Sequence, residues 1–509
     1  MMKHFIWIAG ALLLTLASCR QESDYVLSYA YYDQMAFEKA DSSFAGKFDV
    51  FWHGMNTNYA LWDFEKANGL DWDVVYDTYR PRFAALDAVD TLVSDKQLQE
   101  LMEELVAPLH DGHFAVQMKN HVSGKTVSVS PSSLRIGRER SEEMRAVGNL
   151  KPSVAYYVGA GEVIETRSAS SGTFMTTLSA SINYLKARIA AGDEDPQRLA
   201  LYQQIYNELI AVLTGIITSG DATGGIDGFN RIAYRYEYLQ IPVLKPVDKM
   251  LNQYPVNITY ALFKGNIAYL AFDSFVLSAY VNPEYTKQIF GTTSPQTQAI
   301  IDEVAGTWQA WFDAIQTHHK AGDLGGVIID VRSNGGGFMN DYQYVLGALL
   351  PSGGYQVSNA RFKRGTGRYD YSPVISQFMP TMSGEHVVVT EPIVALCNCA
   401  SVSMAEQTSM GVKLLSNGEL IGTRTWGGFS ALVPNEKYSD NYSGFVGIRD
   451  ETPVFCYIPQ EVAITLDGQI LEGYGVTPDI EIPMDVATWM MGAGPDNQLD
   501  RALQYIRSN

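Results

Sequence analysis

The chain has 509 residues, of which 46% are hydrophobic and 18% are charged. This is the composition of a folded globular protein, and the length suffices for two or three domains with sizeable cores. The formal net charge is −19 and no basic stripe stands out, so the sequence argues against nucleic-acid binding.

The first 20 residues have the pattern of an export signal. Residues 1–18 contain an early lysine and an apolar run that is too short to cross a bilayer comfortably. The segment Leu16–Cys19 resembles a bacterial lipobox, in which Cys19 becomes the lipidated first residue. An ordinary signal peptide with a chance cysteine, or a buried apolar segment, is the alternative. We therefore predict an exported lipoprotein. Arg20, where an aspartate would favour inner-membrane retention, points to the outer membrane of a Gram-negative bacterium.

Residues 19–47 are predicted to form a tether and residues 48–118 an N-terminal helical domain. Within that domain, Ser94–Gln97 fits a capping box ahead of an apolar helix. Pro108 should end that helix because proline cannot continue the helical hydrogen bonding.

Residues 119–250 are an inserted region of uncertain, mixed fold with no clear PDZ domain. We expect strands at Val127–Leu134 and Val154–Val163, and a helical hairpin over residues 178–216. The Gly- and Asp-rich stretch Ser219–Asn230 lacks the ligand spacing of a calcium loop, and we interpret it as a plain loop.

From residue 251 to 485, short apolar strands alternate with helical segments, which indicates an α/β layer structure. The expected strands are Ile267–Phe272, Gly326–Val331, Val387–Val389 and Ile393–Cys397, and the expected helices are Gln298–His318 and Ser403–Gly411. Residues 486–509 form the last segment and contain an amphipathic helix.

The chain has four cysteines, and lipidation of Cys19 would leave three, an odd number that argues against a full disulfide framework. If Cys19 carries lipid, one bridge from Cys456 to Cys397 or Cys399 is still open in an oxidising compartment. No histidine or cysteine stands at ligand spacing from Cys397 and Cys399, so we predict no zinc site.

Asp330–Gly337 is a buried strand that runs directly into three glycines. Glycine lets backbone N–H groups approach a ligand closely, as in a phosphate cradle or an oxyanion hole. A Walker loop needs Gly-Lys-Ser/Thr, and Phe338-Met339 stands there instead, so the oxyanion hole fits better. A tight structural turn is the other interpretation.

Asn398–Glu406 contains two candidate nucleophiles, Ser401 and Ser403, at the start of a predicted helix. The positive end of a helix helps to stabilise a developing oxyanion. Either serine can instead be a simple N-cap. A nucleophilic serine needs a base, and His113 follows Asp111-Gly112 at a turn that can project its ring. His110 and His113 could instead bind metal, although no third ligand is apparent.

A further loop, Glu472–Asp479, carries a carboxylate beside two glycines. With the segments above, it resembles the S41 family of serine peptidases, which includes the C-terminal processing proteases and the tricorn protease core. Leu109–His113 resembles the family's Leu-x-Asp-x-His, Asp330–Gly337 its Asp-Leu-Arg-x-Asn-x-Gly-Gly, and Asn398–Glu406 its serine motif. Glu472–Asp479 resembles its Glu-Gly-x-Gly-x-x-Pro-Asp.

The resemblance implies an α/β fold with a crotonase- and ClpP-like ββα core over residues 251–485. It implies Ser403 as the nucleophile, His113 as the base and Glu472 as a group that orients the histidine. The oxyanion donors would be the backbone N–H groups of Gly336 and Met404, with Gly337 as a further candidate. No metal or organic cofactor is implied.

Two departures from the family pattern matter for the mechanism. The processing proteases use a lysine within Thr-Phe-Gly-Lys-Gly, and Gly428 stands at that position here, which excludes a Ser403–lysine dyad of that kind. In the tricorn-like branch a serine precedes the histidine and links it to a glutamate, whereas Gly112 precedes His113 here.

The function that we predict is an envelope-anchored serine endopeptidase acting on peptides or unfolded proteins. Its partners would be a peptide or unfolded-protein substrate and, through the lipid on Cys19, a membrane. The alternative is a catalytically inactive S41-like lipoprotein that binds peptides or other ligands. A structural role in envelope assembly has no specific support in the sequence. Because Ser403 and His113 lie far apart in the chain, the site must close between the N-terminal domain and the core.

Overall fold

The computed structural model describes residues 42–89, 92–147, 153–192, 194–219, 222–364, 367–384, 386–430, 447, 452–459, 461–485 and 494–509. The predicted signal peptide, the lipobox with Cys19, and most of the predicted tether lie outside the described residues. Among the residues that are described, no helix has both the length and the apolar character needed to cross a membrane.

The N-terminal region is built from four helices packed on a small sheet. The helices are α2 (Phe44–Asn58), α3 (Trp62–Ala67), α4 (Trp72–Asp87) and α5 (Asp95–Val106). The predicted capping box of α5 is present, and the helix ends before Pro108. The sheet has the order β11-β1-β2, with β1 at Ala115–Lys119, β2 at Thr126–Val129 and β11 at Val454–Tyr457. A strand from near the C-terminus therefore completes the N-terminal region.

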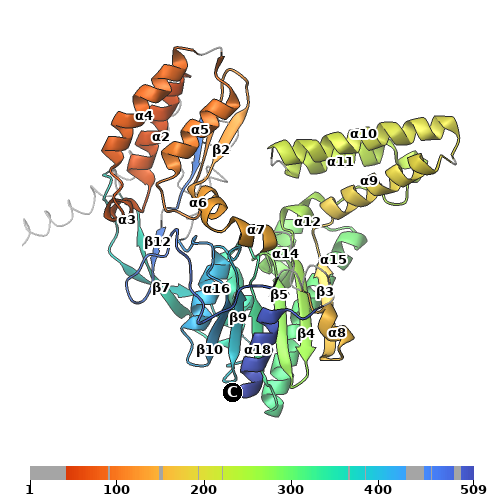
Figure 1. Cartoon of the computed structure of the whole chain (residues 1–509). Coiled ribbons are helices and arrows are strands. Elements are labelled where there is room, and N and C mark those ends of the chain that lie inside the picture. Colours follow the sequence, from red (N-terminus) through yellow and green to blue (C-terminus); the bar gives the residue numbers. More distant parts are fainter. Residues whose placement is uncertain are drawn as a thin grey trace, which may run out of the picture.

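A seven-stranded mixed sheet forms the centre of the molecule, in the order β13-β10-β9-β6-β5-β4-β3 (Figure 1). The strands are β3 (Val163–Ser170), β4 (Asn257–Phe263), β5 (Ile267–Phe272), β6 (Gly326–Asp330), β9 (Ile393–Cys397), β10 (Gly418–Gly422) and β13 (Ile480–Glu481). From β5 to β13 the neighbours are parallel, while β3, β4 and β5 are antiparallel. The predicted α/β fold with a helical N-terminal region is thus confirmed.

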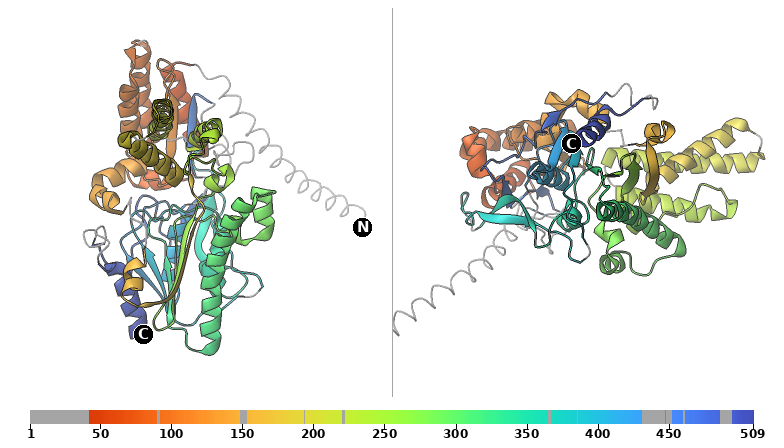
Figure 2. Two further views of the ribbon diagram at one scale, coloured as in Figure 1. Left: turned by 90° about the vertical axis from the view of Figure 1, so that its right-hand side faces the viewer. Right: turned by 90° about the horizontal axis from the view of Figure 1, so that it is seen from below.

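Helices cover both faces of this sheet. Successive side chains of β6 point to opposite faces, so Val327 and Ile329 pack in the same cluster as α15 (Pro295–Ala321), whereas Ile328 packs with α18 (Asn497–Ser508). The left view in Figure 2 shows these two helices on opposite sides of the sheet. Because both faces are buried, every residue of β6 is buried, as is usual for parallel strands.

Three helices, α9 (Phe174–Ala191), α10 (Pro196–Ser219) and α11 (Ala222–Arg235), form an arm that projects from the core (Figure 1). The expected helical hairpin corresponds to α9 and α10. The prediction of a plain loop over residues 219–230 is wrong, because most of that stretch belongs to α11. Its glycines serve close helix packing: a Cβ on Gly225 would lie 2.5 Å from the Ile216 side chain of α10.

Three of the expected strands are wrong in whole or in part. Strand β2 ends at Val129, and Pro131 starts α6 (Pro131–Glu139), where its missing N–H costs nothing. Residues Ala155–Gly159 form α8 rather than a strand, and β3 begins only at Val163. The expected strand at Val387–Val389 is irregular, although these two residues donate backbone hydrogen bonds to Ala348 and Leu349.

The other elements complete the surroundings of the sheet. A third sheet has the order β12-β7-β8, with β7 at Tyr355–Phe362, β8 at Ile375–Met379 and β12 at Glu461–Ile464. The remaining helices are α7 (Ser141–Val147), α12 (Lys249–Gln253), α13 (Ser278–Val281), α14 (Pro283–Phe290) and α16 (Met404–Lys413), with short 3-10 turns at Glu237–Leu239, Met339–Tyr344 and Leu346–Leu349. Cys397, Cys399 and Cys456 are buried free thiols, so the bridge left open by the sequence does not form.

Candidate active site

Ser403 stands at the turn between strand β9 and helix α16. Its backbone has φ 58° and ψ −114°, a conformation that costs energy for a residue with a side chain. Strained turns of this kind, between a strand and a helix, are used to present nucleophilic serines. Ser401 differs, because its buried hydroxyl donates to Val331 O at 2.7 Å and accepts from Asn398 N–H at 3.0 Å. The Ser401 hydroxyl is therefore engaged within the turn, whereas Ser403 is the N-cap residue of α16 and no acceptor for its hydroxyl is recorded among the described residues.

The glycine loop after β6 lies directly against the Ser403 turn. A Cβ on Gly336 would lie 2.6 Å from Ser403 Cβ and 3.1 Å from Met404 N, so only glycine fits there. The N–H of Gly336 donates to Asn334 Oδ1 at 2.8 Å and is already used. Within the described part of the chain, no acceptor is recorded for the N–H groups of Gly337 and Met404. These two N–H groups are thus the better placed of the three predicted oxyanion donors.

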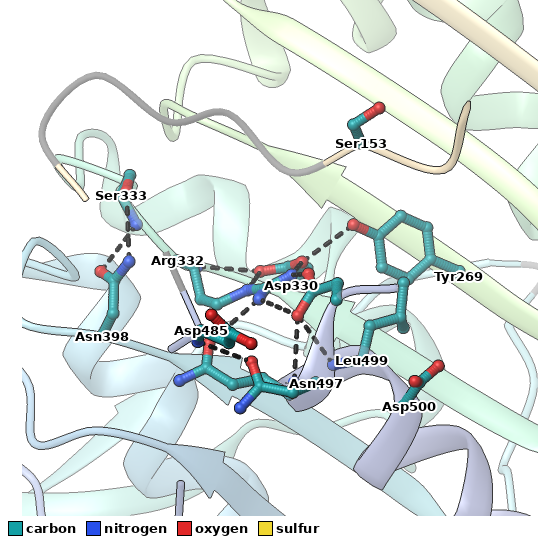
Figure 3. Close-up of polar contacts among 12 residues, drawn as sticks. Ser153, Tyr269, Asp330, Arg332, Ser333, Asn398, Asp485, Asn497, Leu499 and Asp500 are labelled. Atoms are coloured by element: carbon teal, nitrogen blue, oxygen red, sulfur yellow. Dashed lines mark hydrogen bonds and ion pairs between the residues drawn. The ribbon is translucent and has the colours of Figure 1, made fainter. Parts of the chain in front are cut away.

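A buried ion cluster anchors the end of strand β6. The Arg332 guanidinium, 1% exposed, donates to both carboxylate oxygens of Asp330 at 2.6–2.9 Å and forms an ion pair with Asp496 at 2.6 Å. Tyr269 donates to Asp330 at 2.8 Å (Figure 3). Asp496 also caps the N-terminus of α18. The start of the glycine loop is thereby tied to the C-terminal helix across the sheet.

The same close-up shows Asn398 facing Ser333 across the ends of β6 and β9 (Figure 3). Asn398 Oδ1 accepts from Ser333 N–H at 2.9 Å, and its Nδ2 donates to Ser333 Oγ at 3.2 Å. These bonds join the glycine loop to the turn that carries Ser403. Asp330 and Asn398, the first residues of the segments Asp330–Gly337 and Asn398–Glu406, therefore hold the two loops in place.

Glu406, three residues after Ser403, holds several backbone groups of the site in place. Sequence analysis assigned it no role. Its Oε2 accepts from the N–H groups of Ser403 at 3.2 Å and Gly428 at 2.7 Å, and its Oε1 accepts from Gly427 N–H at 2.9 Å and Thr425 Oγ1 at 2.6 Å. Burial raises the pKa of Glu406 to about 7, while the hydrogen bonds from Thr425 and Gly427 oppose that shift.

His113 reaches this centre from the N-terminal region. A Cβ on Gly428 would lie 3.3 Å from Nδ1 and Cε1 of the His113 ring. Because Gly428 and Ser403 share the same oxygen of Glu406, the structure brings Ser403 and His113 to one locus. No hydrogen bond between their side chains is recorded in the described residues, and His113 Nδ1 is buried without a partner there. Burial lowers the pKa of His113 to about 4, so the ring is neutral at pH 7.

Glu472 lies beside His113 but is held by backbone groups. Its Oε2 accepts from Gly112 N–H at 2.9 Å, and its Oε1 accepts from Ser430 N–H. Burial raises the pKa of Glu472, and these two N–H bonds oppose the shift. The residue before His113 thus contacts the glutamate through its backbone N–H.

Asp111 is the third titratable group here and was not singled out from the sequence. A ring nitrogen of His113 and one carboxylate oxygen each of Asp111 and Glu472 lie within 4.8 Å of one another. A set of one imidazole and two carboxylates can in principle hold a cation. His110, the other histidine considered as a ligand, lies instead 2.7 Å from Glu65 Oε2. His110 is therefore not part of this set, in which Glu472 comes from a distant loop and Asp111 from the same turn as His113.

Comparison with known proteins identifies the core. A family-wide sequence profile described as "Peptidase family S41" matches residues 266–482. The chain contains a domain of peptidase family S41. That match includes Ser403, Gly336, Gly337, Met404 and Glu472, whereas His113 lies outside it.

Part of the chain is similar in sequence to part of a much larger enzyme. Tricorn protease of Thermoplasma acidophilum is 31% identical over 185 residues, which are 36% of this chain and 14% of that protein. Tricorn protease of Thermoplasma volcanium is 32% identical over 181 residues, again 36% of this chain and 14% of that protein. The chain therefore spans only a small part of the relatives that it matches.

Among solved structures, mature CPAF complexed with lactacystin aligns over 93% of this chain and 100% of its own, at 13% identity and a TM-score of 0.44. At that score the likeness carries no functional argument.

Proposed function

We propose that the protein is a serine-type endopeptidase of the cell envelope that cleaves peptides or unfolded proteins. The observation that carries this proposal is the strained Ser403, which lies against the glycine loop on one side and shares Glu406 with the Gly428 that contacts His113. The S41 domain supports the same chemistry.

In the proposed mechanism, Ser403 Oγ attacks the scissile carbonyl carbon and His113 takes the hydroxyl proton. The neutral state of His113 at pH 7, which follows from the lowered pKa, leaves it able to accept that proton. The N–H groups of Gly337 and Met404 would stabilise the oxyanion, and one such donor is typically worth about 2.7–4 kcal/mol. His113 then gives the proton to the leaving amine, and water releases the acyl group from Ser403 by the reverse roles. Glu472 would keep the Gly112–His113 turn in place.

The place of action is also part of the proposal. Lipidation at Cys19 and residence in the outer membrane rest on the lipobox alone, since those residues lie outside the described ones. Mass spectrometry of the protein from a membrane fraction would show a lipid-modified N-terminal cysteine. An unmodified Cys19 in a membrane-bound or secreted mature protein would exclude the anchor.

The experiment that tests the activity is labelling of the purified mature protein by a fluorophosphonate probe, with Ser403→Ala, His113→Ala and Ser401→Ala beside the wild type. We expect labelling of the wild type and of Ser401→Ala, and none of the other two variants. A folded wild type that resists labelling would favour the ligand-binding alternative over the peptidase.

A further inference from the structure

Only one carboxylate oxygen of Asp111 accepts hydrogen bonds from neighbouring backbone N–H groups. Its Oδ1 accepts from the N–H of His113 at 2.7 Å and of Phe114 at 2.9 Å, which closes a tight turn. Its Oδ2 is buried and has no hydrogen-bond partner among the described residues. The side chain as a whole is 0% exposed. A buried acceptor without a donor is costly, so a donor for Oδ2 is expected.

A second buried polar atom without a partner belongs to the same cluster. His113 Nδ1 is also buried and unpartnered, and the ring lies within 4.8 Å of the Asp111 and Glu472 carboxylates. Both oxygens of Glu472 already accept backbone N–H groups from Gly112 and Ser430. Asp111 Oδ2 is therefore the carboxylate oxygen of the cluster for which the described residues supply no donor.

We propose that Asp111, rather than Glu472, is the acceptor that orients the imidazole of His113, through a hydrogen bond from Nδ1–H to Oδ2. This inference rests on the proposed peptidase function and adds a positioning residue to it. The bond fixes the tautomer with the proton on Nδ1, which leaves the Nε2 lone pair to take the Ser403 proton. No proton passes to Asp111: it stays on Nδ1 while the imidazolium forms and decays.

Several charged groups face Asp111 and bear on its ionisation. Burial and the nearby charge of Glu472 raise its pKa, the two N–H bonds to Oδ1 lower it, and Glu65 adds a small upward effect. Arg135 lies close enough to interact with both Asp111 and Glu472. A hydrogen bond from the imidazole stabilises the ionised carboxyl and so opposes the effect of burial.

The turn geometry provides a sharp test with Asp111→Asn. Oδ1 is pinned by two N–H donors, so the asparagine must keep its carbonyl oxygen there and place its NH₂ group where Oδ2 was. The turn survives, but the NH₂ now donates to Nδ1 and forces the proton onto Nε2, which disables the base. We expect a fall in kcat of about 10³–10⁴-fold, as for a wrong-tautomer histidine, with little change in KM or melting temperature.

Asp71→Asn is the matched control. Asp71 also accepts two backbone N–H groups, from Asp73 and Val74, at the start of α4 and away from the site. The variant Asp71→Asn should therefore leave kcat unchanged. If Asp111→Asn keeps full kcat, then Asp111 serves only the turn and the proposal is wrong.

A second readout does not depend on peptidase activity. With ¹⁵N-labelled histidine, the ring shifts of His113, assigned with His113→Ala, should report Nδ1–H in the wild type and Nε2–H in Asp111→Asn. The same tautomer in both proteins would overturn the proposal. A tautomer switch in a protein that no probe labels would uphold the Asp111–His113 bond while the peptidase function failed.

Discussion

Gly428 contacts the imidazole of His113, at the position where processing proteases of the S41 family carry their lysine. A Cβ on Gly428 would approach Nδ1 and Cε1 of the ring to 3.3 Å, which is tighter than most Cβ contacts. Any side chain at position 428 would therefore begin close to the His113 ring.

This contact predicts the effect of Gly428→Ala. The methyl group should push the His113 ring by a few tenths of an ångström, enough to lower kcat by about 10–100-fold, since misplacement of about 1 Å can cost 10². Steady-state kinetics check this, with Gly137→Ala as the control. Gly137 has open space around its Cβ position and should tolerate alanine. An unchanged kcat for Gly428→Ala would show that His113 is not the base in this position.

Gly112→Ser tests whether the tricorn-like serine can be restored. A Cβ on Gly112 would lie 2.0 Å from Gly427 O, so any side chain must displace the loop that carries Gly427 and Gly428. We expect a loss of stability of about 1–3 kcal/mol, as for other overpacked sites, and loss of probe labelling. Urea unfolding and labelling measure the two effects. A stable and active Gly112→Ser would mean that the loop moves freely.

Ser401→Ala should act on stability and not on chemistry. The variant leaves Asn398 N–H and Val331 O without their buried partner, which typically costs about 1–3 kcal/mol. Thermal unfolding should therefore show a lower melting temperature, while kcat at a temperature well below unfolding stays near that of the wild type. Selective loss of kcat at unchanged stability would reassign the nucleophile.

The pH dependence of stability should report Glu461. Burial raises its pKa from 4.5 to about 7, and the hydrogen bond with Gln377 opposes this shift. Between these two values the folded protein binds more protons than the unfolded one, so this contribution is present below pH 4.5 and is lost as the pH rises through 7. Glu461→Gln should remove that part of the slope, measured by urea unfolding from pH 4.5 to 7.5. His113, with a lowered pKa of about 4, contributes in the opposite sense: its share is lost as the pH falls from 6.5 towards 4.

The sequence by itself determined the class of fold, and it predicted the groups that the proposed mechanism uses. Apolar strands such as Gly326–Val331 and capped helices such as α5 follow from local periodicity and turn chemistry. They can therefore be predicted without knowing which other segments they pack against. The prediction of a loop before Asn230 was wrong because it rested on the local glycine content. The glycines of that stretch lie in helix α11, and Gly225 is needed there because α10 packs too close for a side chain.

Only the tertiary structure decided how the site is assembled. It brings His113 from the N-terminal region to Ser403, uses the Gly336 N–H for Asn334, occupies both oxygens of Glu472 with backbone groups, and leaves Asp111 Oδ2 free beside the ring. The bond from Gly112 to Glu472, for example, joins residues 360 positions apart. Hydrogen bonds are directional and each lone pair or N–H is used in a particular place, so the roles of neighbouring carboxylates emerge only when the chain is folded.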